Sequence, residues 1–151
     1  MDKFMKIAIN EALKGIENGD GGPFGAVIVK DGKVVSKAHN TVLKKQDSTC
    51  HGEIEAIRKA CKKLGTFDLS SCTLYTTGYP CPMCFGGILW ANIGKVYYGC
   101  TTLDTEKIGF RDKKFENDIK NGKALEICEI GRKECLELYE KYNKITGKKN
   151  Y

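Results

Sequence analysis

Apolar residues near the N-terminus recur every three or four positions, which predicts an amphipathic helix over residues 4–16. Two short apolar runs follow, residues 26–29 and 33–36, and they flank the pair Asp31-Gly32. An Asp-Gly pair between two such runs is the strongest short-range signal of a β-hairpin. We therefore expect two antiparallel strands after the first helix.

The middle of the chain alternates between helical and extended patterns. Residues 53–64 place their apolar side chains on one helical face, and Gly65 follows as a helix terminator. Residues 72–76 and 95–100 are rich in β-branched and aromatic side chains and predict strands, whereas residues 82–92 between them predict a helix. This order is typical of parallel strands joined by a helical crossover.

Beyond residue 100 the hydrophobic pattern is weaker. It indicates a short helix over residues 115–120, a last strand over residues 125–130 and an amphipathic helix over residues 133–145. The chain has 151 residues and shows no repeat or linker, so residues 1–151 are expected to form one domain.

Composition and charge narrow the class of protein. The chain is 41% hydrophobic and 29% charged, which excludes disordered and fibrous proteins. Its net charge of +6 comes from scattered lysines, a pattern that does not indicate nucleic-acid binding. No apolar run approaches the roughly 18 residues of a membrane helix, and the N-terminus does not resemble a signal peptide, so we expect a cytoplasmic protein. In a reducing compartment, its eight cysteines are expected to bind metal or perform chemistry.

Two short motifs stand at the starts of predicted helices. His51 precedes the helix over residues 53–64, and Cys81 and Cys84 stand at the start of the helix over residues 82–92. Two cysteines three positions apart place their sulfurs on one side of a helical turn, where the helix dipole favours thiolates. One imidazole and two thiolates supply three of the four ligands of tetrahedral zinc and leave a position for water. The sequence therefore predicts a catalytic Zn²⁺ site.

Glu53 gives this zinc site its expected chemistry. Zinc lowers the pKa of a bound water to about 7, and a nearby carboxylate can accept the proton and later pass it to a departing group. His-x-Glu followed by Pro-Cys-x-x-Cys is the signature of zinc nucleobase deaminases. Two alternatives remain: a closed structural zinc site with Cys50 as fourth ligand, or a redox dithiol formed by Cys81 and Cys84. Neither alternative gives Glu53 a role.

On these motifs the chain is identified as a member of the cytidine deaminase-like superfamily, and it resembles bacterial guanine deaminases most closely. The resemblance runs nearly end to end and includes residues 21–32, 56–61 and 148–151, together with Gly109-Phe110 and Asp112. Deaminases of cytosine, cytidine and tRNA adenosine share the metal motif. The Gly-Phe-x-Asp segment and the C-terminal tyrosine are features of guanine deaminases.

The resemblance implies a three-layer α/β/α fold around a five-stranded mixed sheet, and a homodimer. The C-terminal tail, about residues 132–151, is exchanged between subunits in similar proteins, so that each tail completes the partner's pocket. The resemblance also assigns roles to individual residues: His51, Cys81 and Cys84 as zinc ligands, Glu53 as proton shuttle, Phe24 stacking on the base, Asn40 hydrogen-bonding it, Asp112 reading its polar edge and Tyr151 closing the site.

The activity implied is the hydrolytic deamination of a free nucleobase, guanine, to xanthine and ammonia. Two features favour cytosine or another aminated heterocycle as an alternative: Tyr79 precedes Pro80, where these deaminases commonly carry glutamate, and Gly52 follows the zinc histidine, as in fungal-type cytosine deaminases. A tRNA adenosine deaminase and a non-catalytic zinc-binding module are further alternatives. A small-molecule substrate is expected, with no membrane partner and no nucleic acid.

Overall fold

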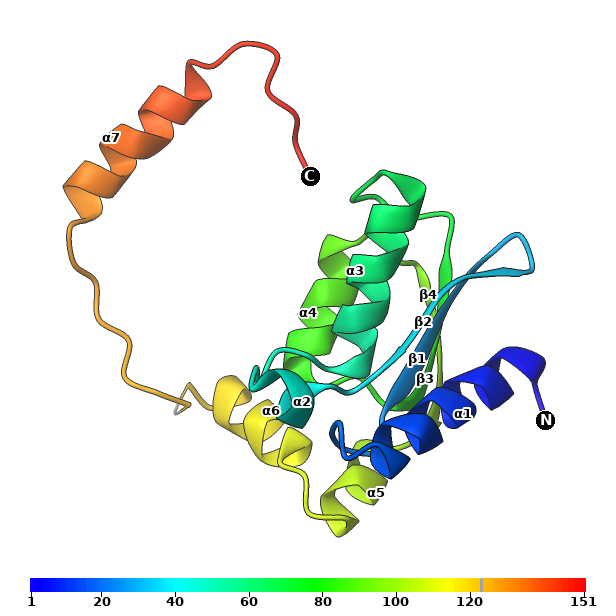
Figure 1. Cartoon of the computed structure of the whole chain (residues 1–151). Helices are drawn as coiled ribbons and strands as arrows, with labels where there is room; N and C mark the ends of the chain where they lie inside the picture. The colour runs from blue at the N-terminus through cyan, green and yellow to red at the C-terminus, as the bar shows by residue number, and fades with distance from the viewer. Residues whose placement is uncertain (123) are drawn as a thin grey trace.

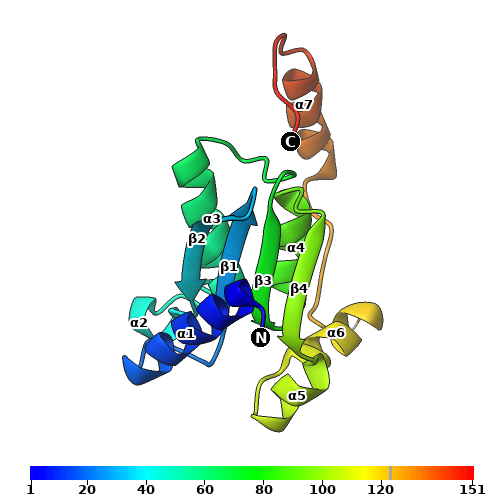
Figure 2. The same ribbon diagram turned by 90° about the vertical axis from the view of Figure 1, so that its right-hand side faces the viewer.

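A computed structural model describes residues 1–122 and 124–151 and shows three layers, with a mixed β-sheet between helices on its two faces (Figure 1, Figure 2). The predicted α/β/α architecture is confirmed. In chain order the elements are α1 (Lys3–Glu17), β1 (Gly25–Lys30), β2 (Lys33–His39), α2 (Val42–Lys45), α3 (Gly52–Leu64), β3 (Thr73–Gly78), α4 (Pro82–Trp90), β4 (Lys95–Cys100), α5 (Thr102–Lys107), α6 (Asp112–Lys120) and α7 (Arg132–Asn143).

The strands lie in the order β2-β1-β3-β4. β1 pairs antiparallel with both β2 and β3, whereas β3 and β4 pair in parallel and are connected through α4. The predicted hairpin is confirmed, because Asp31 and Gly32 connect β1 and β2 with φ angles of 49° and 71°. The predicted parallel pair joined by a helical crossover is confirmed as well.

The two faces of the sheet pack against different helices, because successive side chains of a strand point to opposite faces. Ala26 and Ile28 belong to a core cluster with residues of α3 and α4, whereas Val27 and Val29 pack with Ala8 of α1. In Figure 2, α1 lies in front of the sheet and α3 and α4 lie behind it. α1 therefore supports the sheet from the face opposite α3 and α4.

The expected fifth strand is wrong, because the sheet of the described residues has four strands. Residues 125–130 adopt no strand and are exposed, since no neighbouring strand of this chain provides hydrogen-bond partners for their backbone. The last predicted helix is confirmed as α7, which lies apart from the three layers with no buried residue (Figure 1). None of the helices in the described part of the chain has the length and apolar character needed to cross a bilayer.

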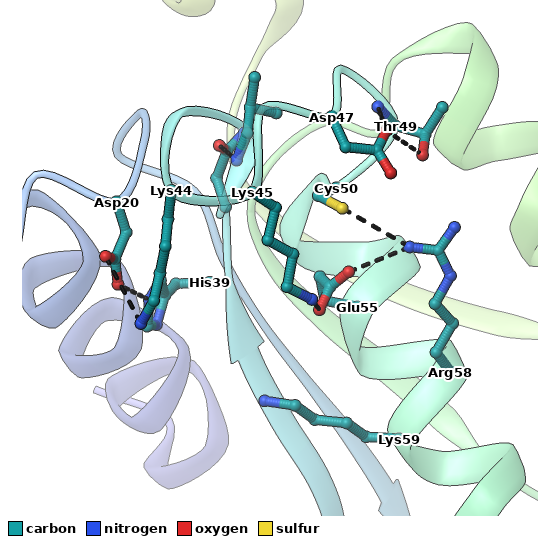
Figure 3. Close-up of polar contacts among 12 residues, drawn as sticks. Asp20, His39, Lys44, Lys45, Asp47, Thr49, Cys50, Glu55, Arg58 and Lys59 are labelled. Atoms are coloured by element: carbon teal, nitrogen blue, oxygen red, sulfur yellow. Dashed lines mark hydrogen bonds and ion pairs between the residues drawn. The ribbon is translucent and has the colours of Figure 1, made fainter.

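The segment between β2 and α3 is fixed by a buried carboxylate. Glu55 in α3 accepts hydrogen bonds from Lys45 Nζ at 2.7 Å and from Arg58 Nη1 at 3.0 Å (Figure 3). Burial opposes ionisation of Glu55, but Lys45, Cys50 and Arg58 together outweigh it and hold the pKa of the carboxyl below its ordinary value of 4.5. The ionised carboxylate therefore ties the end of α2 to the first turns of α3.

Protonation or removal of this carboxylate is expected to destabilise the fold. A group whose pKa is lower in the folded state stabilises above its unfolded pKa, and the stabilisation is lost as the pH falls through the folded pKa. Glu55→Gln should reduce the free energy of unfolding at neutral pH by about 1–3 kcal/mol. It should also lose less stability than the unmodified protein between about pH 5 and pH 3. Urea unfolding at each pH measures both effects, and equal pH dependence in the two proteins would contradict the assignment.

Candidate active site

The N-termini of α3 and α4 converge at the predicted metal ligands. His51 is the N-cap residue of α3, and Cys81 is the N-cap residue of α4, whose first position is Pro82. Proline suits this position because its missing N–H would have no partner there in any case. Cys84 lies in the first turn of α4, so both sulfurs are near the positive end of that helix.

The three ligand atoms have the spacing that tetrahedral zinc requires. His51 Nδ1 lies 3.5 Å from Cys81 Sγ and 3.5 Å from Cys84 Sγ. With Zn–S near 2.3 Å and Zn–N near 2.0–2.1 Å, a tetrahedral angle predicts a separation of about 3.6 Å between nitrogen and sulfur. All three ligand atoms lie within 4.8 Å of one another. The donor set and its geometry therefore fit a zinc ion.

The thiol chemistry of the site is also suited to a metal. The neighbouring Cys84 thiol lowers the pKa of Cys81 to about 4, with a further contribution from the imidazole of His51. The neighbouring Cys81 sulfur, together with burial, raises the pKa of Cys84. One thiolate is thus stabilised before metal binding. Because zinc binds thiolates, loading the site releases the proton of Cys84.

Glu53 lies beside the ligand cluster and is 6% exposed. One carboxylate oxygen accepts a hydrogen bond from Thr76 Oγ1 at 3.2 Å, and the other accepts from Cys84 Sγ at 3.5 Å. Burial raises the pKa of Glu53. A carboxyl group that holds its proton more tightly than usual can act as both base and acid near neutral pH. Glu53 thus lies beside the ligand cluster, as the sequence predicted.

A cavity of about 790 Å³ opens in front of His51 and Glu53. Phe24, Asn40 and Asp112, three of the residues predicted to bind the base, line it. They come from the loop before β1, the end of β2 and the start of α6. Burial, together with the neighbouring Cys81 sulfur, raises the pKa of Asp112. The fold therefore collects these three side chains around one space.

Phe24 is held by contacts on two sides. Its ring meets the ring of Phe110 edge to face, with centroids 4.8 Å apart and an interplanar angle of 82°. A Cβ atom built at Gly52 would approach the carbonyl oxygen of Phe24 to 3.0 Å. The N-terminus of α3 thus packs directly on the Phe24 peptide, and the small residue after His51 permits this approach.

Tyr151 is the predicted site residue that the structure does not bring to the cavity of its own chain. Its ring lies near Phe67 and Trp90, at centroid distances of 6.0 Å and 5.9 Å. It does not belong to the residues that line the cavity among those described. A place for Tyr151 in a partner's cavity stays a prediction.

Several cavity residues carry no local sequence signal. Tyr79, already noted as a departure from related deaminases, lines the cavity and packs edge to face on Tyr98 at 5.1 Å. The others come from loops, from α6 and, for Met83, from the first turn of α4, and the Gly-Phe-x-Asp resemblance pointed only to Phe110. They are Ser48, Met83, Phe110, Arg111, Phe115 and Ile119.

Cys50, the fourth ligand considered for a closed structural zinc site, does not lie with the three predicted ligands. The metal-ligating group found in residues 1–122 and 124–151 consists of His51, Cys81 and Cys84. The Cys50 sulfur accepts instead from Arg58 Nη1 at 3.7 Å (Figure 3). Three protein ligands are the number found in catalytic zinc sites, where water or substrate would take the fourth position.

Comparison with known proteins agrees with this geometry. A guanine deaminase from Bacillus subtilis is 39% identical over 153 residues, which cover 99% of this chain and 98% of that protein. Its crystal structure matches with a TM-score of 0.93 at 38% identity, covering 100% of this chain and 99% of that one. A structure of a variant of NE0047 in complex with 8-azaguanine matches with a TM-score of 0.69 at 34% identity, over 72% of this chain and 63% of that one.

tRNA-specific adenosine deaminases are also similar to this chain, and one from Buchnera aphidicola is 37% identical over 142 residues, which cover 93% of this chain and 92% of that protein. A tRNA-specific adenosine deaminase from Aquifex aeolicus is 44% identical over 95 residues, which cover 63% of this chain and 62% of that protein. Residues 1–100 match the family described as the cytidine and deoxycytidylate deaminase zinc-binding region, and they contain the ligand cluster and Glu53. The chain belongs to this zinc-binding deaminase family.

Proposed function

We propose that the protein catalyses the zinc-dependent hydrolysis of guanine to xanthine and ammonia. The observation that carries this proposal is the arrangement of Asn40, Glu53 and Asp112 around one cavity beside the metal ligands. Similarity to a guanine deaminase over nearly the whole chain supports the choice of base.

The cavity residues suit the groups that guanine offers. Asn40 Oδ1 accepts a hydrogen bond from the backbone N–H of Val42 at 3.0 Å, so the amide NH₂ of Asn40 is left to donate to a ring nitrogen or carbonyl oxygen. Asp112 supplies carboxylate oxygens, which accept from the ring N–H and amino group of guanine. Phe24 offers an aromatic face to the flat purine.

In the proposed reaction, Glu53 moves protons and the other cavity residues hold the base. When bound by His51, Cys81 and Cys84, zinc supplies Lewis acidity that makes water a nucleophile at neutral pH. Glu53 accepts a proton from the attacking water and delivers protons to the ring and to the departing amino group. The balance is guanine plus water giving xanthine plus ammonia.

We further propose that the enzyme works in the cytoplasm as a homodimer in purine metabolism. All eight cysteines are free of disulfides, which suits a reducing compartment. Apolar side chains of α4 are exposed, with Leu89 at 62% and Trp90 at 66%, and so are Leu138 and Tyr139 of α7. A dimer that exchanges its C-terminal tails covers such surfaces and brings Tyr151 to the partner's cavity.

Substrate choice is tested by measuring ammonia release from guanine, cytosine, adenine and isocytosine with purified protein of known zinc content. We expect guanine to have the highest kcat/KM. Dialysis against a chelator should abolish release, and added zinc should restore it. Preferred release from cytosine would overturn the choice of base. Undiminished activity in fully zinc-free protein would overturn the metal mechanism.

The role of Glu53 is tested by Glu53→Gln, which keeps the shape of the side chain but removes the titrating group. We expect full zinc content and a fall in kcat of about two to four orders of magnitude, the usual contribution of a general acid–base residue. Zinc analysis and steady-state kinetics on guanine measure the two effects. A variant with near-normal kcat would show that another group transfers the protons.

Tail exchange is tested by mixing two inactive variants, Glu53→Gln and Tyr151→Ala, after joint unfolding and refolding. If tails are exchanged, a mixed dimer has one cavity with native Glu53 and native Tyr151. Random pairing then gives about one quarter of wild-type activity, because half of the dimers are mixed. No gain on mixing would mean that each tail serves its own chain, whereas activity in Tyr151→Ala alone would mean that Tyr151 is not required.

A further inference from the structure

His39 is a buried titratable group to which the proposed chemistry gives no task. It is the last residue of β2, and its side chain is 12% exposed. Because side chains alternate along a strand, His39 and Lys37 face α1, whereas Asn40 is turned to the opposite side and lines the cavity. His39 itself does not belong to the cavity lining in the described part of the chain.

Both ring nitrogens of His39 face carboxylates. Nε2 lies 2.8 Å from Asp20 Oδ2, and Nδ1 lies 3.3 Å from Glu11 Oε2 (Figure 3 shows the Asp20 contact). The bond to His39 holds the pKa of Asp20 below its ordinary value, so the carboxylate is an acceptor. His39 thus links α1 to the segment after it, because each of its ring nitrogens contacts a carboxylate.

Asp20 also contacts α2, which borders the cavity. Its backbone carbonyl oxygen accepts from the N–H groups of Leu43 at 3.0 Å and Lys44 at 3.1 Å, and Lys44 Nζ lies 3.8 Å from its carboxylate (Figure 3). Asp20 is 5% exposed. One residue therefore joins the end of β2, through His39, to the first turn of α2.

Two hydrogen bonds fix Asn40, one through its backbone and one through its side chain. Its N–H donates to the carbonyl oxygen of Phe24 at 2.9 Å, and its Oδ1 accepts from Val42 N–H. A Cβ atom built at Gly21, next to Asp20, would lie 2.1 Å from Asn40 Oδ1. The backbone after Asp20 therefore presses closely on the Asn40 amide, and a shift of Asp20 would displace that amide.

We propose that His39 and Asp20 form a positioning pair that fixes the orientation of the Asn40 amide and thereby sets the affinity of the cavity for a base. The pair acts through Asn40 and touches neither the metal ligands nor Glu53. This inference rests on the proposed function only in taking a nucleobase as the ligand. The pair affects the binding of the base, so a substitution in it should change KM and leave kcat nearly constant.

Two substitutions of His39 separate positioning from simple stability. In His39→Gln the amide nitrogen of the new side chain takes the place of Nε2 and keeps a donor toward Asp20. In His39→Asn the shorter side chain places its nitrogen near the Nδ1 position and keeps a donor only toward Glu11. Each variant loses one of the two bonds, so a purely structural role predicts similar effects for both. Glu11→Gln serves as the matched control, because it weakens the contacts of Glu11 with His39 and Lys37 and leaves the contact between His39 and Asp20 in place.

We expect His39→Asn to raise KM for guanine by about tenfold, whereas His39→Gln and Glu11→Gln stay within about threefold of the unmodified enzyme. In a Glu53→Gln background, calorimetry with 8-azaguanine should show the same order of Kd values without turnover. Zinc content should be equal in all variants. Equal KM values for His39→Asn and His39→Gln would overturn the proposal. If His39→Asn does not fold, Asp20→Asn, which weakens the same bond, takes its place with the same expected result.

A ligand-free measurement separates this proposal from the proposed function. The side-chain NH₂ group of Asn40 gives a ¹⁵N signal whose relaxation reports its order. We expect greater mobility of this group in His39→Asn than in His39→Gln, whether or not guanine is the substrate. Unchanged order in both variants would overturn the positioning role, even if guanine is deaminated. Altered order without any base binding would instead reject the proposed function and keep the pair as a positioning device.

Discussion

The structure depends on the meeting of two helix N-termini, those of α3 and α4. Unpaired backbone N–H groups give each terminus a partial positive charge, and this charge favours the thiolates that bind metal there. A carboxylate buried at the same place would be costly without partners. Glu53 has them, because Thr76 reaches it from β3 and Cys84 from α4. The sheet and both helices thus contribute one group each to the same small volume.

The sheet also connects this site to α1 on its far side. At the end of β2, His39 contacts α1 and the following residue, Asn40, lines the cavity, so α1 supports this part of the cavity wall from the opposite face of the sheet. The hydrogen bonds of Asp20 close the connection by holding α2 against the same strand end. The helix layer formed by α1 thus contacts His39, the last residue of β2, while the next residue, Asn40, lines the cavity on the other side.

Most regular elements were predictable because their signals are local. The Asp-Gly turn, the helix that begins at Pro82 and the strands on either side of it follow from spacing over a few residues. The fifth strand failed because a strand needs a neighbour for its hydrogen bonds, and residues 125–130 have none in this chain. α5 was missed although its N-terminus has a capping box of Thr101 and Asp104, since the helix is too short to show periodicity.

The sequence by itself determined that His51, Cys81 and Cys84 can hold a metal with Glu53 beside them, because residue type and spacing at the start of a helix are local properties. Only the tertiary structure decided which residues enclose the cavity and which do not. Phe24 and Phe110 meet across a long stretch of sequence, and Tyr151 lies outside the cavity of its own chain. Such contacts depend on how distant segments pack, and the energy of packing is shared among many residues, so no short pattern in the sequence specifies them.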